Sequence, residues 1–202
     1  MLCRSRGTRG AIQEVEYHEA WQRARQEAAY RALLQGLIKM KPFKSLSEVV
    51  DWLHQRASKY GHGTRFKFLV ANGPSRYGKT QWAKALYGVD NTLVIPCQGV
   101  LQPNLKELCR TRARAIVFDE ASPQMVVANK ALFQAGIDPV LLAQSKCNDY
   151  AYSVFVYGMP MVVCTNDWDI GVSPHDREWL DKNSVVIQVT EPLWEEHEPL
   201  QM

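Results

Sequence analysis

The apolar positions in the first third of the chain recur at helical spacing. Between residues 12 and 40 they lie among Glu, Gln and Arg, which predicts one long helix that ends before Pro42. Ser45 and Glu48 form a capping-box pattern, which predicts a second helix that closes at residues 60–63. Because two helices bury little surface alone, we expect this segment to pack on the following domain or on a neighbouring subunit.

From residue 65 the pattern changes to short apolar runs that alternate with helical segments. This alternation predicts an α/β fold with a central, mostly parallel sheet. The expected strands are residues 66–71, 92–95, 115–118, 161–164 and 184–189, and the expected helices are 79–87, 104–109 and 124–134. A chain of 202 residues accommodates one such domain with a small helical appendage. The expected units are therefore a helical segment 1–60, an α/β domain 61–194 and a tail 195–202.

A phosphate-binding loop pattern, G-x-x-x-x-G-K-[ST], follows the first predicted strand and precedes a predicted helix. Its residues are Gly73, Pro74, Ser75, Arg76, Tyr77, Gly78, Lys79 and Thr80. The two glycines let successive backbone N–H groups surround a phosphate at the helix N-terminus. Lys79 would reach the β- and γ-phosphates, and the Thr80 hydroxyl would bind magnesium. The alternative is a glycine-rich turn with an incidental lysine.

Two later strands end in polar residues that suit the same chemistry. Residues 115–118 lead into Asp119 and Glu120. Asp119 would hold Mg²⁺ through water, and Glu120 would orient the water that attacks the γ-phosphate. Asn166 follows the strand 161–164 and could face the γ-phosphate, because ligands of parallel sheets bind at the carboxyl ends of strands. The alternatives are a surface strand that ends in acids, and a loop asparagine that starts a turn with Asp167.

The composition of the chain bears on its cellular location and its partners, but it does not indicate a reaction. The net charge of +3 is too small to indicate nucleic acid, so a DNA-binding surface must come from local clustering. The arginines between residues 110 and 114 could touch phosphates or form a solvated basic turn. Five scattered cysteines suggest neither a zinc site nor a disulfide framework, and a reducing intracellular location fits them. No apolar run reaches membrane-spanning length, so no membrane partner is expected.

The three motifs, in this order, resemble superfamily 3 helicases. The resemblance is greatest to the helicase domain of replication-initiator (Rep) proteins of circular single-stranded DNA viruses, over about residues 45–194. It is carried by the stretches GPSRYGKTQWAKAL, AIVFDEASP, LFQAG, SKCNDYAYSVFVYGMP, VVCTND and EWLDKNSVVIQV.

The resemblance implies an AAA+-like phosphate-loop ATPase fold with ATP and Mg²⁺ as cofactors. It implies a 3′-to-5′ motor that moves on single-stranded DNA or unwinds forked DNA during rolling-circle replication. It also implies a homo-oligomer, usually a hexameric ring, in which the segment before residue 60 is the oligomerisation region. The host nucleus would be the location if the source is a eukaryotic virus.

The chain departs from the family in two respects. The paired histidines and tyrosine nucleophile of the nicking endonuclease are missing from this sequence, so nicking is not expected. The basic residue that family members place in the DNA channel aligns with Val156 or Tyr157. Lys146 could replace that contact, and Arg177 or Lys182 could act as the arginine finger. The aromatic residues that could stack on bases or pack within the hairpin are Tyr150, Tyr152, Phe155 and Tyr157.

Two functional hypotheses therefore remain open from different classes. The first is a Rep-like motor that couples ATP hydrolysis to movement on DNA. The second is a nucleotide-binding, oligomerising module without motor activity, which the missing channel lysine favours. A small-molecule kinase fits less well, because no arginine-rich lid follows the loop and Asn166 would have no role. No base-reading motif separates ATP from GTP.

Overall fold

The computed structural model describes residues 25–26, 42–59, 65–142 and 151–195. Contacts divide the chain into two compact units, residues 1–41 and 42–202. The predicted helix 12–40 lies outside the described residues except for Arg25 and Gln26. The second unit contains the helices and strands from α2 to β7.

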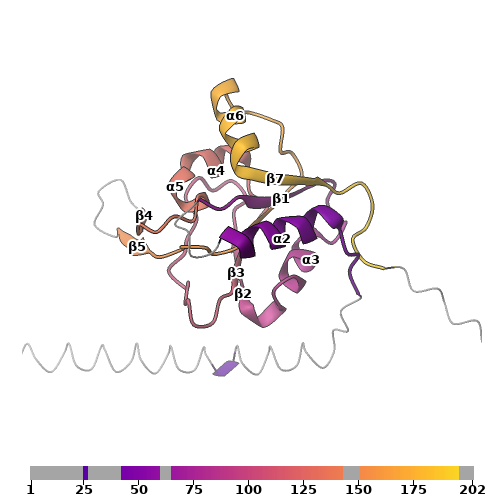
Figure 1. Cartoon of the computed structure of the whole chain (residues 1–202), viewed down its shortest axis with the longest axis horizontal. Coiled ribbons are helices and arrows are strands. Elements are labelled where there is room, and N and C mark those ends of the chain that lie inside the picture. The colour runs from indigo at the N-terminus through magenta and orange to yellow at the C-terminus, as the bar shows by residue number, and fades with distance from the viewer. Residues whose placement is uncertain (1–24, 27–41, 60–64, 143–150, 196–202) are drawn as a thin grey trace, which may run out of the picture. The chain divides into compact units, whose positions relative to one another are not determined.

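A five-stranded, fully parallel sheet forms the centre of this unit (Figure 1). Its strand order is β2-β3-β6-β1-β7. The strands are β1 (Phe68–Asn72), β2 (Thr92–Pro96), β3 (Ala115–Asp119), β6 (Met161–Thr165) and β7 (Ser184–Gln188). A separate antiparallel pair joins β4 (Val140–Leu142) and β5 (Tyr152–Val154). The five predicted strands are confirmed, and so is the α/β class with a central parallel sheet.

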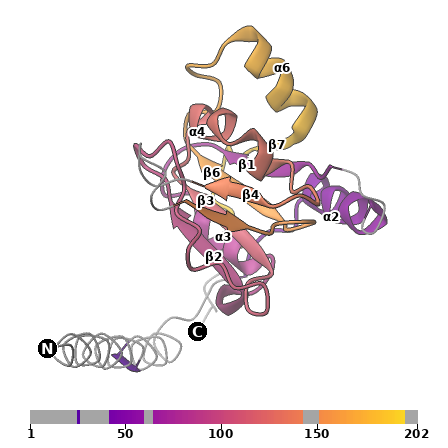
Figure 2. The same ribbon diagram turned by 90° about the vertical axis from the view of Figure 1, so that its left-hand side faces the viewer.

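Helices cover both faces of the sheet because successive strand residues point to opposite sides. Leu69 and Ala71 pack with α2 (Ser47–Lys59) and α3 (Lys79–Ala85). Phe68 and Val70 face the opposite layer, which holds α4 (Pro123–Ala128), α5 (Lys130–Phe133) and α6 (Pro174–Asn183). Figure 2 shows α2 and α4 on opposite sides of the strands. A short 3-10 helix, Val89–Asn91, precedes β2.

Helix α2 packs on the sheet rather than forming part of a separate segment. Val49 and Trp52 are buried against the sheet, and Trp52 Nε1 donates to the Lys67 carbonyl at 2.9 Å. The helix begins at Ser47, two residues after the predicted cap at Ser45, and Val50 N donates to the Leu46 carbonyl. The predicted helical segment 1–60 thus contains a helix that belongs to the compact unit 42–202.

Two of the predicted helices are wrong in extent or existence. Residues 104–109 are irregular with a turn at 106–107, because Asn104 Oδ1 accepts from Lys106 N and Leu105 N donates to the Tyr152 hydroxyl. The helix predicted over 124–134 is two helices that meet at Asn129. The Asn129 amide donates to the Met125 and Leu101 carbonyls and so competes with helical bonding.

The sequence reasoning omitted α6, although its start has a recognisable signal. Ser173 caps the helix by accepting from Asp176 N, and Pro174 occupies its first turn. Lys130 Nζ on α5 lies 2.7 Å from Asp176 Oδ1, which ties α6 to the helical layer on that face. The segment after Asn166 therefore has a fixed place beside the carboxyl end of β6.

Candidate functional site

The glycine-rich loop 73–78 connects β1 to α3 and has no space for side chains at its two glycines. A Cβ on Gly73 would lie 2.2 Å from the Val189 carbonyl oxygen. Gly78 has φ of 81°, and a Cβ there would lie 2.9 Å from the Trp194 ring. Neighbouring strands hold the loop, because Gly73 N donates to the Thr165 carbonyl. Close packing therefore requires glycine at both positions, and the positive φ of Gly78 also favours glycine there.

Lys79 begins α3 and points its ammonium back into this loop. Its Nζ donates to the carbonyls of Gly73 and Pro74 at 2.7 and 2.6 Å, and to Asn166 Oδ1 at 2.9 Å. These three acceptors match the three donors of an ammonium group. Burial lowers the pKa of Lys79, while the charges of Asp119 and Glu120 act in the opposite direction. The lysine is thus held at the place where the loop closes on itself.

Thr80 connects the loop to the carboxyl end of β3. Its hydroxyl donates to Asp119 Oδ1 at 2.6 Å. A hydroxyl and a carboxylate are hard oxygen donors of the kind that Mg²⁺ prefers, so this pair suits a magnesium ion that keeps water and phosphate oxygens as its other ligands. Among the described residues, three or more His, Cys, Asp or Glu side chains nowhere gather closely enough to hold a metal ion.

Glu120 is exposed and follows Asp119 at the end of β3. Its φ of 54° lies in the left-handed region, which non-glycine residues rarely occupy. The next residue, Ala121, donates its N–H to the Cys164 carbonyl, so β6 fixes the direction of the chain at this point. Strained backbone of this kind recurs at functional sites, where surrounding structure enforces it.

The three predicted motifs meet at one edge of the sheet. Gly73, Glu120 and Asn166 each follow the carboxyl end of a strand, and the three strands are neighbours in the order β3-β6-β1. Lys79 contacts Asn166, and Thr80 contacts Asp119. Of the other predicted loop residues, Tyr77 packs against the apolar layer under α2 and α3, whereas the exposed ones are Pro74, Ser75 and Arg76.

Asn72 is a further residue of this site that sequence reasoning missed. It ends β1, is 8% exposed, and donates from Nδ2 to Gln188 Oε1 at 3.0 Å. Its Oδ1 accepts from Trp168 N at 3.2 Å. The side chain therefore holds both the β7 end and the segment after Asn166. A polar residue at the end of an apolar strand, just before the loop, was the signal available in the sequence.

Replacing Asn72 with alanine is expected to destabilise the protein by about 1–3 kcal/mol, because the buried Trp168 N–H loses its acceptor. Urea unfolding measures this free-energy change. Asn91→Ala is a matched control, because Asn91 is half-buried and its amide donates at 3.3 Å to the Tyr87 carbonyl of a surface turn. Equal effects of the two substitutions would contradict the positioning role of Asn72.

The two arginine-finger candidates are engaged within α6 and the loop before it. Arg177 Nη2 donates to the Trp168 carbonyl at 2.6 Å, and its Nη1 lies 3.6 Å from Asp169 Oδ1. Lys182 pairs with Glu178 one helical turn away. In this chain Arg177 therefore shapes the segment after Asn166.

Most of the predicted DNA contacts are used for packing or lie outside the described residues. Val156 is fully buried, and Tyr157 packs edge-on against Phe66. The Tyr152 hydroxyl accepts from Leu105 N at 2.7 Å, so the packing alternative holds for both tyrosines. Phe155 is 64% exposed and could still stack on a base. Lys146 and Tyr150 lie outside the described residues.

No protein-family model matches this chain, and no curated protein matches its sequence. Within the described ranges, no helix is both long and apolar enough to cross a membrane. Function must therefore be inferred from the geometry of the loop and the strand ends around it.

Proposed function

We propose that this protein is a phosphate-loop nucleoside triphosphatase of the AAA+-like type that binds ATP and Mg²⁺ at residues 73–80. One observation carries the proposal: Lys79 contacts Asn166 while the adjacent Thr80 contacts Asp119. These contacts would not be expected of a glycine-rich turn with an incidental lysine, because they join the loop to the carboxyl ends of both β3 and β6. These strand ends are where ligands of parallel sheets bind.

The residues have separate tasks in hydrolysis. Backbone N–H groups of the loop and the Lys79 ammonium bind the β- and γ-phosphates and offset their charge. Glu120 accepts a proton from the attacking water, whose oxygen bonds to the γ-phosphorus as the bond to the bridging oxygen breaks. ADP and phosphate are the products. Asn166 donates from its amide to a γ-phosphate oxygen and so distinguishes ATP from ADP.

Thr80 and Asp119 are the residues that would hold Mg²⁺, because their oxygens lie 2.6 Å apart beside the loop. Bound there, the ion would supply positive charge that offsets the negative charge developing during phosphoryl transfer. Asp119 at the end of β3 also fixes the position of the Thr80 side chain by accepting from its hydroxyl.

We further propose that hydrolysis drives movement on single-stranded or forked DNA, as in the Rep-like superfamily 3 helicases that the chain resembles. The order of the three motifs and the β4–β5 pair before Asn166 support this assignment. Such motors act as homo-oligomers, in which a neighbouring subunit supplies charge to the transferring phosphate.

A nucleotide-binding, oligomerising module without motor activity is the second candidate. Its support comes from the two positions that align with the family's basic channel residue, because Val156 is buried and Tyr157 packs against Phe66. The Tyr152 hydroxyl is likewise used inside the domain. Such a module would assemble with nucleotide but would have no salt-sensitive DNA affinity.

ATP hydrolysis with Mg²⁺, measured with and without single-stranded DNA, tests these functions. Lys79→Ala is expected to lower kcat by on the order of 10²–10³-fold, because it removes a preorganised phosphate donor. Lys84→Ala, on the same helix and half-exposed, is the matched control and should keep wild-type activity.

Stimulation by DNA that disappears in Lys79→Ala supports the motor. Hydrolysis that ignores DNA supports the module instead. Failure of the wild-type protein to hydrolyse ATP in any oligomeric state would contradict the enzymatic proposal altogether.

A further inference from the structure

A cavity lies at the opposite edge of the sheet from the proposed nucleotide site. It has a volume of about 630 Å³. Three of its lining residues lie just before strands: Phe66 before β1, Arg114 before β3 and Pro160 before β6. Because five strand residues span about 16 Å, the cavity is well separated from Lys79 at the carboxyl edge. A ligand bound here would not touch the loop 73–78.

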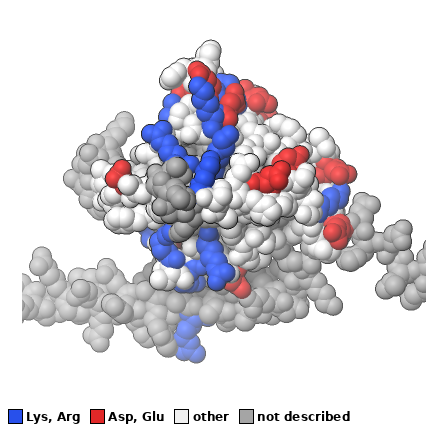
Figure 3. Space-filling view, in the orientation of Figure 1, with Lys and Arg blue, Asp and Glu red and all other residues white. Residues whose placement is uncertain are grey.

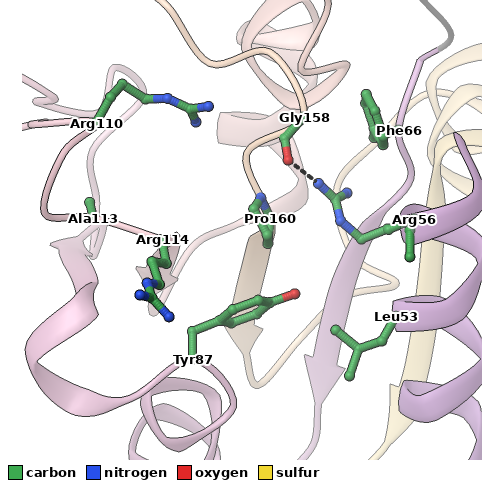
Figure 4. Close-up of a pocket in the computed structure, with 10 residues that line it drawn as sticks. Leu53, Arg56, Phe66, Tyr87, Arg110, Ala113, Arg114, Gly158 and Pro160 are labelled. Atoms are coloured by element: carbon green, nitrogen blue, oxygen red, sulfur yellow. Dashed lines mark hydrogen bonds between the residues drawn. The ribbon is translucent and has the colours of Figure 1, made fainter. Parts of the chain in front are cut away.

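Three arginines line this pocket, Arg56, Arg110 and Arg114, and none of the ten lining residues is acidic. Arg56 is 8% exposed, and its Nη2 donates to the Gly158 carbonyl at 2.7 Å (Figure 4). It also donates to the Lys67 carbonyl at 3.0 Å. Burial lowers the pKa of Arg56 to about 10, so the guanidinium still carries its charge at neutral pH. A buried cation without a carboxylate partner in the lining makes the pocket attractive to anions.

The other two arginines are exposed at the pocket's rim and belong to the basic run before β3. Arg110 Nη2 donates to the Tyr157 carbonyl at 3.2 Å, which turns its guanidinium towards Gly158. Figure 4 shows Arg110 and Arg114 on the same side of the cavity, opposite Arg56. Lys and Arg side chains form a vertical band on the face of the molecule that Figure 3 shows. Each of these guanidiniums offers a phosphate at the rim two N–H donors in bidentate geometry.

The rest of the lining is apolar or aromatic. Leu53, Phe66 and Pro160 contribute carbon surface, and Tyr87 extends across one side of the cavity (Figure 4). Burial raises the pKa of Tyr87 to about 12, so its hydroxyl stays neutral and can donate a hydrogen bond. An apolar cavity of this size with a few convergent polar groups fits a ligand as large as a nucleotide.

We propose that this pocket binds one nucleotide unit of single-stranded DNA, with the base against Tyr87 and the backbone phosphate on Arg110 and Arg114. A base within a duplex is paired and stacked, so only an unstacked base can enter a cavity of this kind. The choice of a DNA strand over a free nucleotide rests on the proposed function. The affinity for a nucleoside phosphate follows from the pocket's own charge and shape.

The test is fluorescence anisotropy with a labelled short oligothymidylate over a range of salt concentrations. The double variant Arg110→Ala/Arg114→Ala should bind at least tenfold more weakly than wild type. Its slope of log K against log salt should be smaller by about 0.7, because the two arginines share one phosphate and each lost phosphate contact on a single strand removes about 0.7. Arg112→Ala is the matched control, since Arg112 is exposed in the same run but does not line the pocket.

Equal affinity of the double variant and Arg112→Ala would overturn the proposal. So would equal competition by duplex and single-stranded DNA, because a duplex cannot insert a base. Thymidine monophosphate should compete weakly at the same arginines. If the double variant weakens only the monophosphate and not the oligonucleotide, the DNA strand is excluded as the ligand.

ATP hydrolysis without DNA separates this proposal from the proposed enzyme function. The double variant should hydrolyse ATP at the wild-type rate, because its arginines lie at the edge away from Lys79. If wild type hydrolyses no ATP but the double variant loses DNA affinity, the enzyme function fails and the pocket stands. If ATP hydrolysis behaves as proposed but DNA affinity is unchanged, the pocket proposal fails alone.

Discussion

Replacing Glu120 with glutamine is expected to lower kcat for ATP hydrolysis by on the order of 10²–10⁴-fold. Glutamine keeps the size of the side chain but cannot accept the proton of the attacking water. Nucleotide affinity should change little, because the residues proposed to bind phosphates and Mg²⁺ are Lys79, Thr80 and Asp119. Steady-state hydrolysis and equilibrium binding of a fluorescent ATP analogue measure the two quantities separately.

Glu107→Gln is the appropriate control for the lost charge. Glu107 is exposed in the turn-rich segment before β3 and lies outside the candidate site. This variant should hydrolyse ATP like wild type. If Glu120→Gln also turned over at the wild-type rate, Glu120 could not be the group that activates water, and its left-handed backbone would need another explanation.

The central sheet was predictable because buried parallel strands are continuous apolar runs. All five residues of β1 and of β6 are buried, so neither strand needs alternating polar positions that would obscure its pattern. Errors at the strand ends are small for the same reason. The apolar run of β3 stops at Phe118, but the strand includes Asp119, because Asp119 still pairs with Cys164 of β6. Hydrogen bonding therefore extends a strand beyond its hydrophobic signal.

The helix errors have a common cause in asparagine side chains. Asn104 and Asn129 offer the backbone local partners that compete with helical bonds. Whether the competition succeeds depends on distant groups, the Tyr152 hydroxyl in one case and the Leu101 carbonyl in the other. Such partners are far away in the sequence, so local periodicity contains no information about them.

The candidate site shows the same division between local and distant information. The spacing of Gly73, Gly78 and Lys79 is local and was readable from the sequence. The contact between Lys79 and Asn166 joins residues 87 positions apart and depends on the order of strands in the sheet. The second pocket depends on the same order, because it needs residues that precede three different strands. Sequence motifs predicted the parts of the first site but could not predict the second.

Replacing Gly73 with alanine is expected to lower both stability and activity. The new Cβ would lie 2.2 Å from the Val189 carbonyl oxygen, a backbone atom that cannot rotate away. Relief requires the loop and the segment after β7 to separate, which should reduce the free energy of unfolding by about 1–3 kcal/mol. The same displacement moves Lys79, whose Nζ is bonded to the Gly73 carbonyl. Misplacement of about 1 Å in a phosphate site can lower kcat by on the order of 100-fold.

Gly136→Ala separates this steric effect from the general cost of replacing glycine. A Cβ on Gly136 meets nothing within 4 Å, so this variant should unfold within about 1 kcal/mol of wild type and hydrolyse ATP normally. Urea unfolding and ATP hydrolysis of both variants form the test. A Gly73→Ala protein as stable and active as Gly136→Ala would mean that the loop does not pack against Val189 in solution. The phosphate site would then need a different loop conformation from the one that brings Lys79 to Asn166.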